Sequence, residues 1–318
     1  MSIVEKTLKK LQDAAQQARG ETASLVSPSA VRGRVPEAVA PRRVPIGNAN
    51  KTVRIDHDRL RASGLLPPEH QQREISHQYR TLKRPLIKHA FDNGEAVAND
   101  GASLRLIMVS SALPGEGKTF TSMNLAMSLA LEKDHSVILV DGDVPKPHIS
   151  QTFGLLKEPG LLDALVDPSV AIESVLLPTD VPNLALLPVG HRAEAAPELL
   201  ASARMRQVIS RLEQIDPQGL VVVDSPPILL TSEARVLASL FGQVVLVVHA
   251  GTTQQKAVLE AIELIGDGPR VGLVLNQASA EGNAGDYYGY YYGSSGDELG
   301  DKDITRPLAP VNSKNNEK

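Results

Sequence analysis

The chain has 318 residues, 42% of them hydrophobic and 22% charged, and its formal net charge is −4. This composition is typical of a globular protein and excludes wholesale disorder. Cysteine is absent, which excludes disulfides and zinc–thiolate sites. The sequence contains no apolar stretch of the roughly 18 residues that a spanning helix needs, and its start lacks an apolar signal core, so we expect a cytoplasmic location.

The positive and negative charges are unevenly distributed. Residues 1–90 are net basic, whereas residues 91–318 are net acidic. A basic segment of this kind is either a solvated arm or a contact surface for an acidic partner or a membrane. The sequence leaves both interpretations open.

Three segments precede the main pattern. Residues 1–19 carry apolar side chains at helical spacing, which predicts a short amphipathic helix. Residues 20–52 contain four prolines and no apolar period, which predicts a flexible linker. Residues 74–82 have a helical pattern, and we expect Pro85 to end or kink that helix.

From residue 104 onward, short apolar runs alternate with amphipathic helical segments. The runs are apolar at nearly every position, which is typical of strands buried on both faces of a sheet. They cover residues 104–111, 136–141, 184–189, 220–224, 244–249 and 271–276. The helical segments cover residues 119–132, 198–215, 232–241 and 254–265. This alternation predicts an α/β fold with a doubly wound, mainly parallel sheet, in a domain spanning residues 53–280.

The C-terminal part of the chain has a different character. Residues 277–301 hold six glycines and five acidic residues with no basic residue, and we predict a disordered tail over residues 281–318. Five of the six tyrosines of the chain stand in this tail, at Tyr287, Tyr288, Tyr290, Tyr291 and Tyr292. They form either a dense set of hydroxyl acceptors or a low-complexity segment that stacks on a partner.

A glycine-rich sequence follows the first predicted strand. Residues 112–119 read A-L-P-G-E-G-K-T and lead into a helical segment. This is nearly the phosphate-binding motif G-x-x-x-x-G-K-[ST] in its required context, with Ala112 at the first glycine, and it indicates a P-loop NTPase-like domain. The alternative is a helix-capping turn. Gly115 and Gly117 allow the backbone N–H groups to face phosphate oxygens, Lys118 is expected to reach the β- and γ-phosphates, and Thr119 to ligate Mg²⁺. The predicted ATP-binding residues are Pro114, Gly115, Glu116, Gly117, Lys118, Thr119, Phe120 and Asn276.

Polar side chains end three further strands of the predicted sheet. Asp141 and Asp143 follow the second strand, Asp224 ends the fourth, and Asn276 ends the last. Because carboxyl ends of parallel strands share one edge, these residues are expected to face the phosphate loop. Carboxylates suit Mg²⁺ as ligands, although each aspartate is also a common turn or cap residue. Asn276 either binds a nucleobase or forms a turn.

The motifs together resemble those of the bacterial tyrosine kinases. The resemblance is carried by S-S-A-L-P-G-E-G-K-T, I-L-V-D-G-D-V-P-K-P, V-V-V-D-S-P-P and the terminal tyrosine cluster. The stretch Y-R-T-L-K-R-P-L at residues 79–86 and the opening M-S-I-V-E-K-x-L-K-K-L-Q are similar to the exosortase-associated tyrosine autokinases of exopolysaccharide operons.

This resemblance implies an ATP- and Mg²⁺-dependent tyrosine autokinase. It implies catalytic roles for Lys118, Asp141 and Asp143, with either aspartate as the base. The magnesium ligands would be Thr119, Asp141 and Asp224, the last through water. The phosphoacceptors would be the five tail tyrosines, modified between neighbouring subunits.

Two family motifs are altered. Pro145 stands where the family has arginine, and Lys146 follows it. The subunit-contact motif E-x-x-R-x-x-R reads His77, Arg80 and Lys83, so its acidic residue is missing. The resemblance assigns subunit contacts to Arg80 and Lys83.

The resemblance also implies partners and a location. The expected partners are other copies of the chain in a homo-oligomer, a membrane chain-length determinant (a polysaccharide co-polymerase) and a phosphotyrosine phosphatase, and no nucleic acid is expected. The chain would be peripheral to the inner membrane through its chain-length-determinant partner. Two alternatives remain. One is a partition- or positioning-type nucleotide-switch ATPase, against which Leu113 stands at the position of that group's signature lysine. The other is an ATP-dependent assembly module without kinase activity.

Overall fold

The computed structural model describes residues 51–91, 97–98 and 101–278. The predicted N-terminal helix, most of the linker and the tyrosine-rich tail lie outside the described residues. No helix in the described part of the chain is long and apolar enough to cross a membrane.

The fold is built around a seven-stranded sheet with the order β3-β4-β2-β5-β1-β6-β7. All neighbouring strands are parallel except β3, which is antiparallel to β4. The central strands β1, β2 and β5 are buried at every residue because they consist almost entirely of β-branched and other apolar side chains. The predicted doubly wound, mainly parallel sheet is therefore confirmed. The strands are β1 (Leu106–Ser111), β2 (Val137–Asp141), β3 (Leu177–Pro178), β4 (Leu184–Leu187), β5 (Leu220–Asp224), β6 (Gln243–His249) and β7 (Arg270–Asn276).

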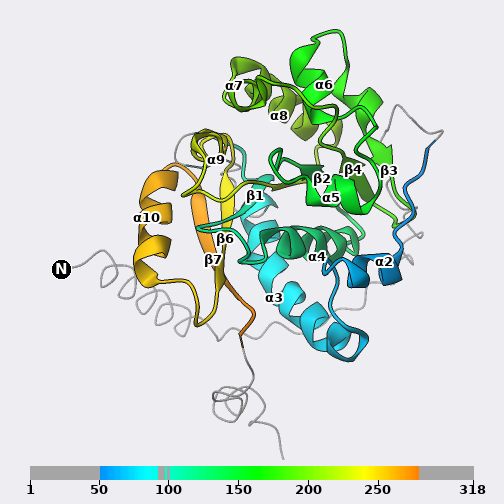
Figure 1. The fold of residues 1–318 in the computed structure, drawn as a ribbon. Coiled ribbons are helices and arrows are strands. Elements are labelled where there is room, and N and C mark those ends of the chain that lie inside the picture. Colours follow the sequence, from blue (N-terminus) through cyan, green and yellow to red (C-terminus); the bar gives the residue numbers. More distant parts are fainter. Residues whose placement is uncertain (1–50, 92–96, 99–100, 279–318) are drawn as a thin grey trace, which may run out of the picture. The chain divides into compact units, whose positions relative to one another are not determined.

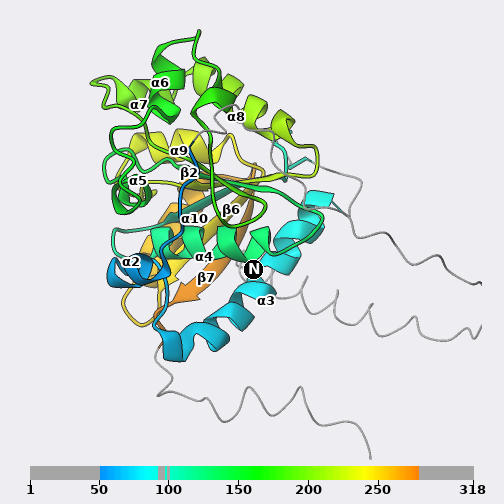
Figure 2. The same ribbon diagram turned by 90° about the vertical axis from the view of Figure 1, so that its right-hand side faces the viewer.

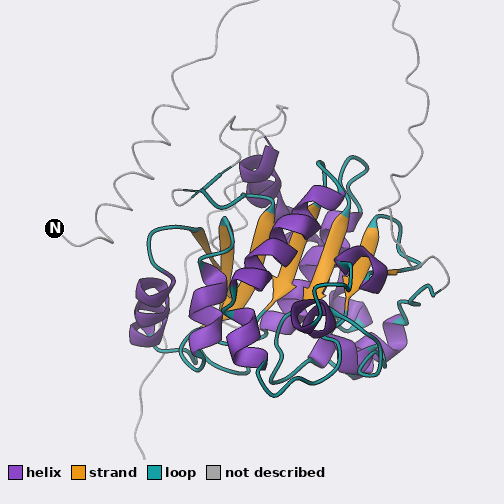
Figure 3. Ribbon diagram, turned by 90° about the horizontal axis from the view of Figure 1, so that it is seen from above, coloured by secondary structure: helices purple, strands orange, loops and turns teal. Residues whose placement is uncertain are grey.

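Helices cover both faces of the sheet, as Figure 3 shows from above. Successive strand residues point to opposite faces and join two separate hydrophobic clusters. Helices α3 and α4 pack on one face and α6 to α10 on the other (Figures 1 and 2). The helices are α2 (His57–Ala62), α3 (Gln72–Phe91), α4 (Lys118–Ala130), α5 (His148–Thr152), α6 (Leu161–Val166), α7 (Ala196–Leu200), α8 (Ala203–Ile215), α9 (Ser232–Ala238) and α10 (Gln255–Ile265), with 3₁₀ turns at Glu69–Gln71 and Ile172–Val175.

Of the two effects predicted for Pro85, ending the helix is wrong, and a kink stays a prediction. Helix α3 does not end at Pro85 but continues to Phe91. A proline inside a helix removes one backbone hydrogen bond and costs about 3 kcal/mol. The cost is offset by tertiary packing, because Leu86 and Ala90, which follow Pro85, are buried together with Tyr79 on the inner side of the helix.

The region between β2 and β5 contains more helices and strands than the sequence pattern predicts. The predicted helix 198–215 is two helices, α7 and α8, because the Ser202 side chain accepts a hydrogen bond from the Met205 N–H and starts a new helix. Helices α5 and α6 and strand β3 were not predicted. They are short elements without a long amphipathic period, and residues of α5 and α6 line one side of the site described below.

Candidate functional site

The glycine-rich loop joins the end of β1 to the start of α4. Gly115 and Gly117 have φ angles of 82° and 93°, in the left-handed region that favours glycine. Gly117 is also the residue that precedes the first turn of α4, where backbone N–H groups are unpaired and attract anions. A Cβ atom on Gly117 would collide with the side-chain amide of Asn276. The loop therefore has the conformation and the position of a phosphate-binding loop.

Glu116 and Asn276 hold this loop in place. The Glu116 carboxylate is buried and accepts hydrogen bonds from the Leu113 N–H, at 2.9 Å, and from the Thr253 hydroxyl. The Asn276 side-chain amide donates to the Glu116 carbonyl oxygen at 2.9 Å, and the Gln277 amide donates to the Gly115 carbonyl at 3.4 Å. The end of β7 thus touches the loop directly. A contact of Asn276 with a nucleobase stays a prediction.

Two further residues with predicted ATP contacts, Pro114 in the loop and Phe120 in α4, have different surroundings. Pro114 is exposed on the loop. Phe120 is partly buried in the cluster on the α3 side, where its ring centroid is 6.5 Å from that of Tyr79. The ring of Phe120 thus packs against α3 in this structure.

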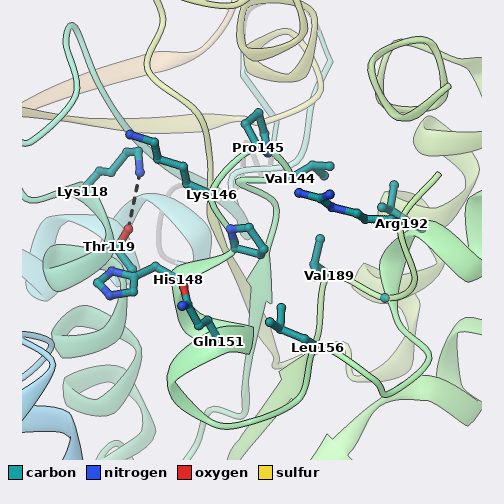
Figure 4. Close-up of a pocket in the computed structure, with 13 residues that line it drawn as sticks. Lys118, Thr119, Val144, Pro145, Lys146, His148, Gln151, Leu156, Val189 and Arg192 are labelled. Carbon is teal, nitrogen blue, oxygen red and sulfur yellow. Dashed lines mark hydrogen bonds between the residues drawn. The ribbon is translucent and has the colours of Figure 1, made fainter. Parts of the chain in front are cut away.

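Lys118 starts α4 and points at the carboxyl ends of the strands. Its Nζ donates to an Asp143 carboxylate oxygen at 2.5 Å and to the Thr119 hydroxyl at 3.4 Å, the latter drawn in Figure 4. Burial favours the neutral amine, but the nearby carboxylates of Asp224 and Asp143 outweigh it and raise the pKa of Lys118. The side chain is a fixed cation at the mouth of the loop.

Asp141 and Asp224 lie next to each other on β2 and β5 and are fully buried. Burial, together with the neighbouring Asp224 carboxylate, raises the pKa of Asp141 to about 7. Burial also raises the pKa of Asp224, to about 6, although the Lys118 ammonium limits the rise. Each side chain has one bonded oxygen: the Ser150 N–H donates to Asp141 at 2.7 Å, and the Ser122 hydroxyl donates to Asp224 at 3.0 Å.

The second carboxylate oxygen of Asp141 and of Asp224 is buried without a hydrogen-bond partner. Unpaired buried acceptors are costly, so these two oxygens suit a position for a cation or its water ligands. Among the described residues, no three His, Asp or Glu side chains are placed so that they could hold a metal ion by themselves. Mg²⁺ commonly takes one or two carboxylates, waters and substrate phosphates, and this donor set, with the Thr119 hydroxyl nearby, fits Mg²⁺ bound together with a nucleotide.

A cavity of about 650 Å³ opens beside Lys118 and Thr119. Its other walls come from the loop after β2, from α5 and from the segment after β4, including Lys146, His148 and Arg192 (Figure 4). The volume is in the range of sites for small molecules and cofactors. The sequence showed Lys146 only as a departure from a motif, and it gave no signal for His148 or Arg192, because the short elements that place them were not predicted.

The two predicted subunit-contact residues, Arg80 and Lys83, have different surroundings. Arg80 is exposed on α3. Lys83 is buried, donates to the Ser128 carbonyl at 2.6 Å and pairs with Glu132 at 2.7 Å. The Lys83 side chain therefore binds groups of its own chain. Subunit contacts by both residues stay a prediction, and Arg80 is the more accessible of the two.

Comparisons with known proteins bear on the whole domain. The AAA domain family matches residues 104–264. The tyrosine-protein kinase YwqD of Bacillus subtilis is 28% identical over 218 residues, which is 68% of this chain and 86% of that protein. The tyrosine-protein kinase CpsD of Streptococcus agalactiae is 30% identical over 196 residues, 60% of this chain and 83% of that protein.

Solved structures show the same likeness. The kinase domain of the Escherichia coli tyrosine kinase ETK superposes with a TM-score of 0.52 at 27% sequence identity, covering 66% of this chain and 80% of that one. The residues matched by the AAA domain family, 104–264, include the glycine-rich loop and the ends of β2 and β5, where the buried aspartates lie.

Proposed function

Because this chain belongs to the bacterial tyrosine-protein kinase family, we propose that it is an ATP- and Mg²⁺-dependent tyrosine autokinase. The observation that carries the proposal is the meeting of Lys118 with Asp141, Asp143 and Asp224 beside the glycine-rich loop, with two carboxylate oxygens left unpaired. A phosphoryl transferase needs phosphate binding, metal ligands and a base, and this group of residues supplies all three.

The nucleotide site follows from the loop. Backbone N–H groups of residues 115–119 cradle the phosphates, and Lys118 leaves Asp143 to contact the β- and γ-phosphates. Thr119, Asp141 and Asp224 hold Mg²⁺, the last through water. When bound, the metal neutralises phosphate charge and orients the transferring group.

The transfer step balances without another reactant. The phenolic oxygen of a tyrosine forms a bond to the γ-phosphorus, the bond from that phosphorus to the bridging oxygen breaks, and ADP leaves. The phenolic proton passes to a carboxylate. Asp141 and Asp143 both lie near Lys118, and Asp143 becomes available once Lys118 turns to the phosphates. Both remain candidates for the base.

The acceptors are the five tail tyrosines. The sixth tyrosine, Tyr79, is buried, and its burial raises its pKa to about 12, so its hydroxyl is not presented for transfer. The tail starts from the end of β7, at the loop itself. The cluster lies roughly 14 residues further along the sequence, and a random coil of that length has an r.m.s. reach of roughly 20 Å, which would allow transfer to an adjacent subunit.

The biological setting follows from the family resemblance. We propose a homo-oligomer in the cytoplasm, held at the inner membrane by a chain-length-determinant partner, that regulates exopolysaccharide synthesis and export and is reset by a phosphotyrosine phosphatase. The basic segment 1–90 supports contact with an acidic or membrane-bound partner.

Mass spectrometry after incubation with Mg·ATP tests the proposal. We expect phosphate on the peptide containing residues 287–292, none on Tyr79, and none in a Lys118→Met variant. ATP hydrolysis without any phosphotyrosine, even with the partner's cytoplasmic segment present, would refute the kinase function and favour a nucleotide-switch ATPase.

A further inference from the structure

We propose that the cavity beside Lys118 is an acceptor site that selects tyrosines flanked by carboxylates, and that Lys146 and Arg192 recognise those carboxylates. The occupant is the segment 281–301 of a second copy of this chain. The inference rests on the proposed function, and it adds the chemical basis on which the acceptor is chosen.

The wall of the cavity is positively charged. Lys118, Lys146 and Arg192 line it, and no aspartate or glutamate does. Lys118 is already paired with Asp143. Within the described ranges, neither Lys146 nor Arg192 makes an ion pair, and both are exposed. Figure 4 shows Lys146 extending toward Lys118 and the Arg192 guanidinium pointing in from the opposite wall. Two cations are therefore available for a ligand.

The floor of the same cavity is apolar. Leu162 and Val189 are buried beneath it, and Leu156 is 46% exposed at its edge. An exposed leucine beside unpaired cations suits a ligand that combines a ring with negative charge. A phenol ring fits such a surface, because its face packs on aliphatic side chains while its hydroxyl stays near the polar end at Lys118.

The tail has the complementary composition. Residues 277–301 carry five acidic and no basic side chains, and Asp286 directly precedes Tyr287. Complementary charges of this kind guide encounter and fix the register of a bound segment. The segment that supplies the acceptors is thus the part of the chain whose charge matches the cavity wall.

Phosphorylation strengthens this match. Each phosphotyrosine adds about −1.5 to −2 charges at neutral pH. A tail that already carries one phosphate is therefore held more tightly by Lys146 and Arg192, and the next tyrosine is modified before the segment leaves.

Peptide binding and transfer test the inference. The probes are a labelled peptide of residues 281–298 and a neutral peptide in which its acidic residues become Asn or Gln. Affinity is measured by fluorescence anisotropy with the full chain and Mg·ADP, and transfer is measured with Mg·ATP. The variants are Lys146→Gln and Arg192→Gln, with Arg206→Gln on α8 as the matched control, because Arg206 is exposed and outside the cavity.

We expect each cavity variant to weaken binding of the acidic peptide roughly two- to fivefold, the range of exposed ion pairs, and to raise its KM similarly. Binding of the neutral peptide should not change, and salt should remove the preference of the unaltered chain. Arg206→Gln should bind both peptides as the unaltered chain does.

Three other results have distinct meanings. Equal preference for the acidic peptide in all variants would overturn the inference and leave the kinase function standing. Weaker Mg·ATP binding in Lys146→Gln and Arg192→Gln, with unchanged peptide preference, would assign both cations to the nucleotide and also overturn it. Charge-dependent peptide binding without any phosphotyrosine would support the acceptor site and refute the kinase function.

Discussion

The two sides of the cavity are built differently. On the side of the glycine-rich loop, Lys118 and Thr119 line the cavity, and the neighbouring carboxylates Asp141, Asp143 and Asp224 do not. These five residues, here called the near wall, are buried or nearly so, and most of their side chains are held by hydrogen bonds within the chain. The opposite side, the far wall (Lys146, His148, Leu156, Val189 and Arg192), is mainly exposed.

This difference matches two different tasks. Phosphoryl transfer requires charges that are fixed before the substrate arrives, because reorganising them during the reaction raises the barrier. A site that receives several tyrosines of one segment in turn requires a surface with looser positioning. Changes in the near wall should therefore affect chemistry and stability, and changes in the exposed side chains of the far wall should affect acceptor binding alone.

The largest effect is expected at Gly117. A Gly117→Ala substitution places a side chain at a φ of 93° and against the Asn276 amide. Backbone strain of this kind costs about 1–3 kcal/mol, and we expect Mg·ATP affinity to fall by roughly tenfold or more if the bound loop bears it. Isothermal titration calorimetry measures the loss.

Gly115→Ala is the matched control for that prediction. Gly115 has a similar φ of 82°, but nothing lies within 4 Å of an added Cβ. Its loss of affinity should be smaller, and Asn276→Ala in the Gly117→Ala background should recover part of the difference. Equal losses of Mg·ATP affinity in both single variants would show that the contact with Asn276 does not constrain the loop.

The second-largest expected effect is on the pH dependence of stability. Asp141 has a pKa near 7 in the folded protein against 3.8 for an ordinary aspartate, so the folded state binds its proton more tightly than the unfolded state. Without Mg²⁺, the free energy of unfolding should therefore decrease as the pH rises from about 4 through 7. Asp224, with a pKa near 6, adds to the decrease.

Asp141→Asn should make this decrease smaller, and urea denaturation at several pH values in EDTA measures it. Asp134→Asn, which changes an exposed carboxylate, should keep the unaltered profile. If Asp141→Asn showed the same pH profile of stability as the unaltered chain, the raised pKa of Asp141 would not contribute to the pH dependence.

The smallest effect on stability is expected in the far wall. Leu156→Ala removes a side chain that is 46% exposed, so the free energy of unfolding should stay within about 0.5 kcal/mol. Binding of the tail peptide should weaken about fourfold if the peptide covers the equivalent of one methylene of this side chain, because roughly 0.8 kcal/mol is lost for each buried methylene.

Val189→Ala is the contrasting change, since Val189 is buried beneath the same surface. It should lower the free energy of unfolding by about 1–2 kcal/mol through lost packing. Thermal and chemical denaturation distinguish the two variants. An equal loss of stability in Leu156→Ala and Val189→Ala would contradict the view that Leu156 is a surface contact and Val189 part of the packed core beneath it.

The near wall could be predicted from the sequence because each of its parts is local. Lys118 and Thr119 belong to one short motif, and Asp141 and Asp224 end apolar runs whose parallel pairing brings them to one edge. The far wall could not be predicted. Arg192 joins it only after the short elements between β2 and β5 fold, and none of them is long enough to show a clear period.

Long-range bonds were equally hidden. The hydrogen bond between Glu116 and Thr253 joins residues 137 positions apart, and no local pattern announces it. Likewise, the spacing of Arg80 and Lys83 on one helix gives no sign that one is exposed while the other is buried against Glu132. Such differences depend on which surface each helix turns toward the core.

The bonds from Asn276 and Gln277 to the glycine-rich loop have a kinetic consequence. They fix the end of β7 at the glycine-rich loop, so under the proposed function the tail tyrosines are tethered reactants. A short flexible tether gives an effective concentration in the millimolar range. Within an assembled particle, the rate of autophosphorylation per chain should therefore be first order and unaffected by dilution, until dilution separates the subunits. At such local concentrations, weak capture of the acceptor is sufficient for turnover.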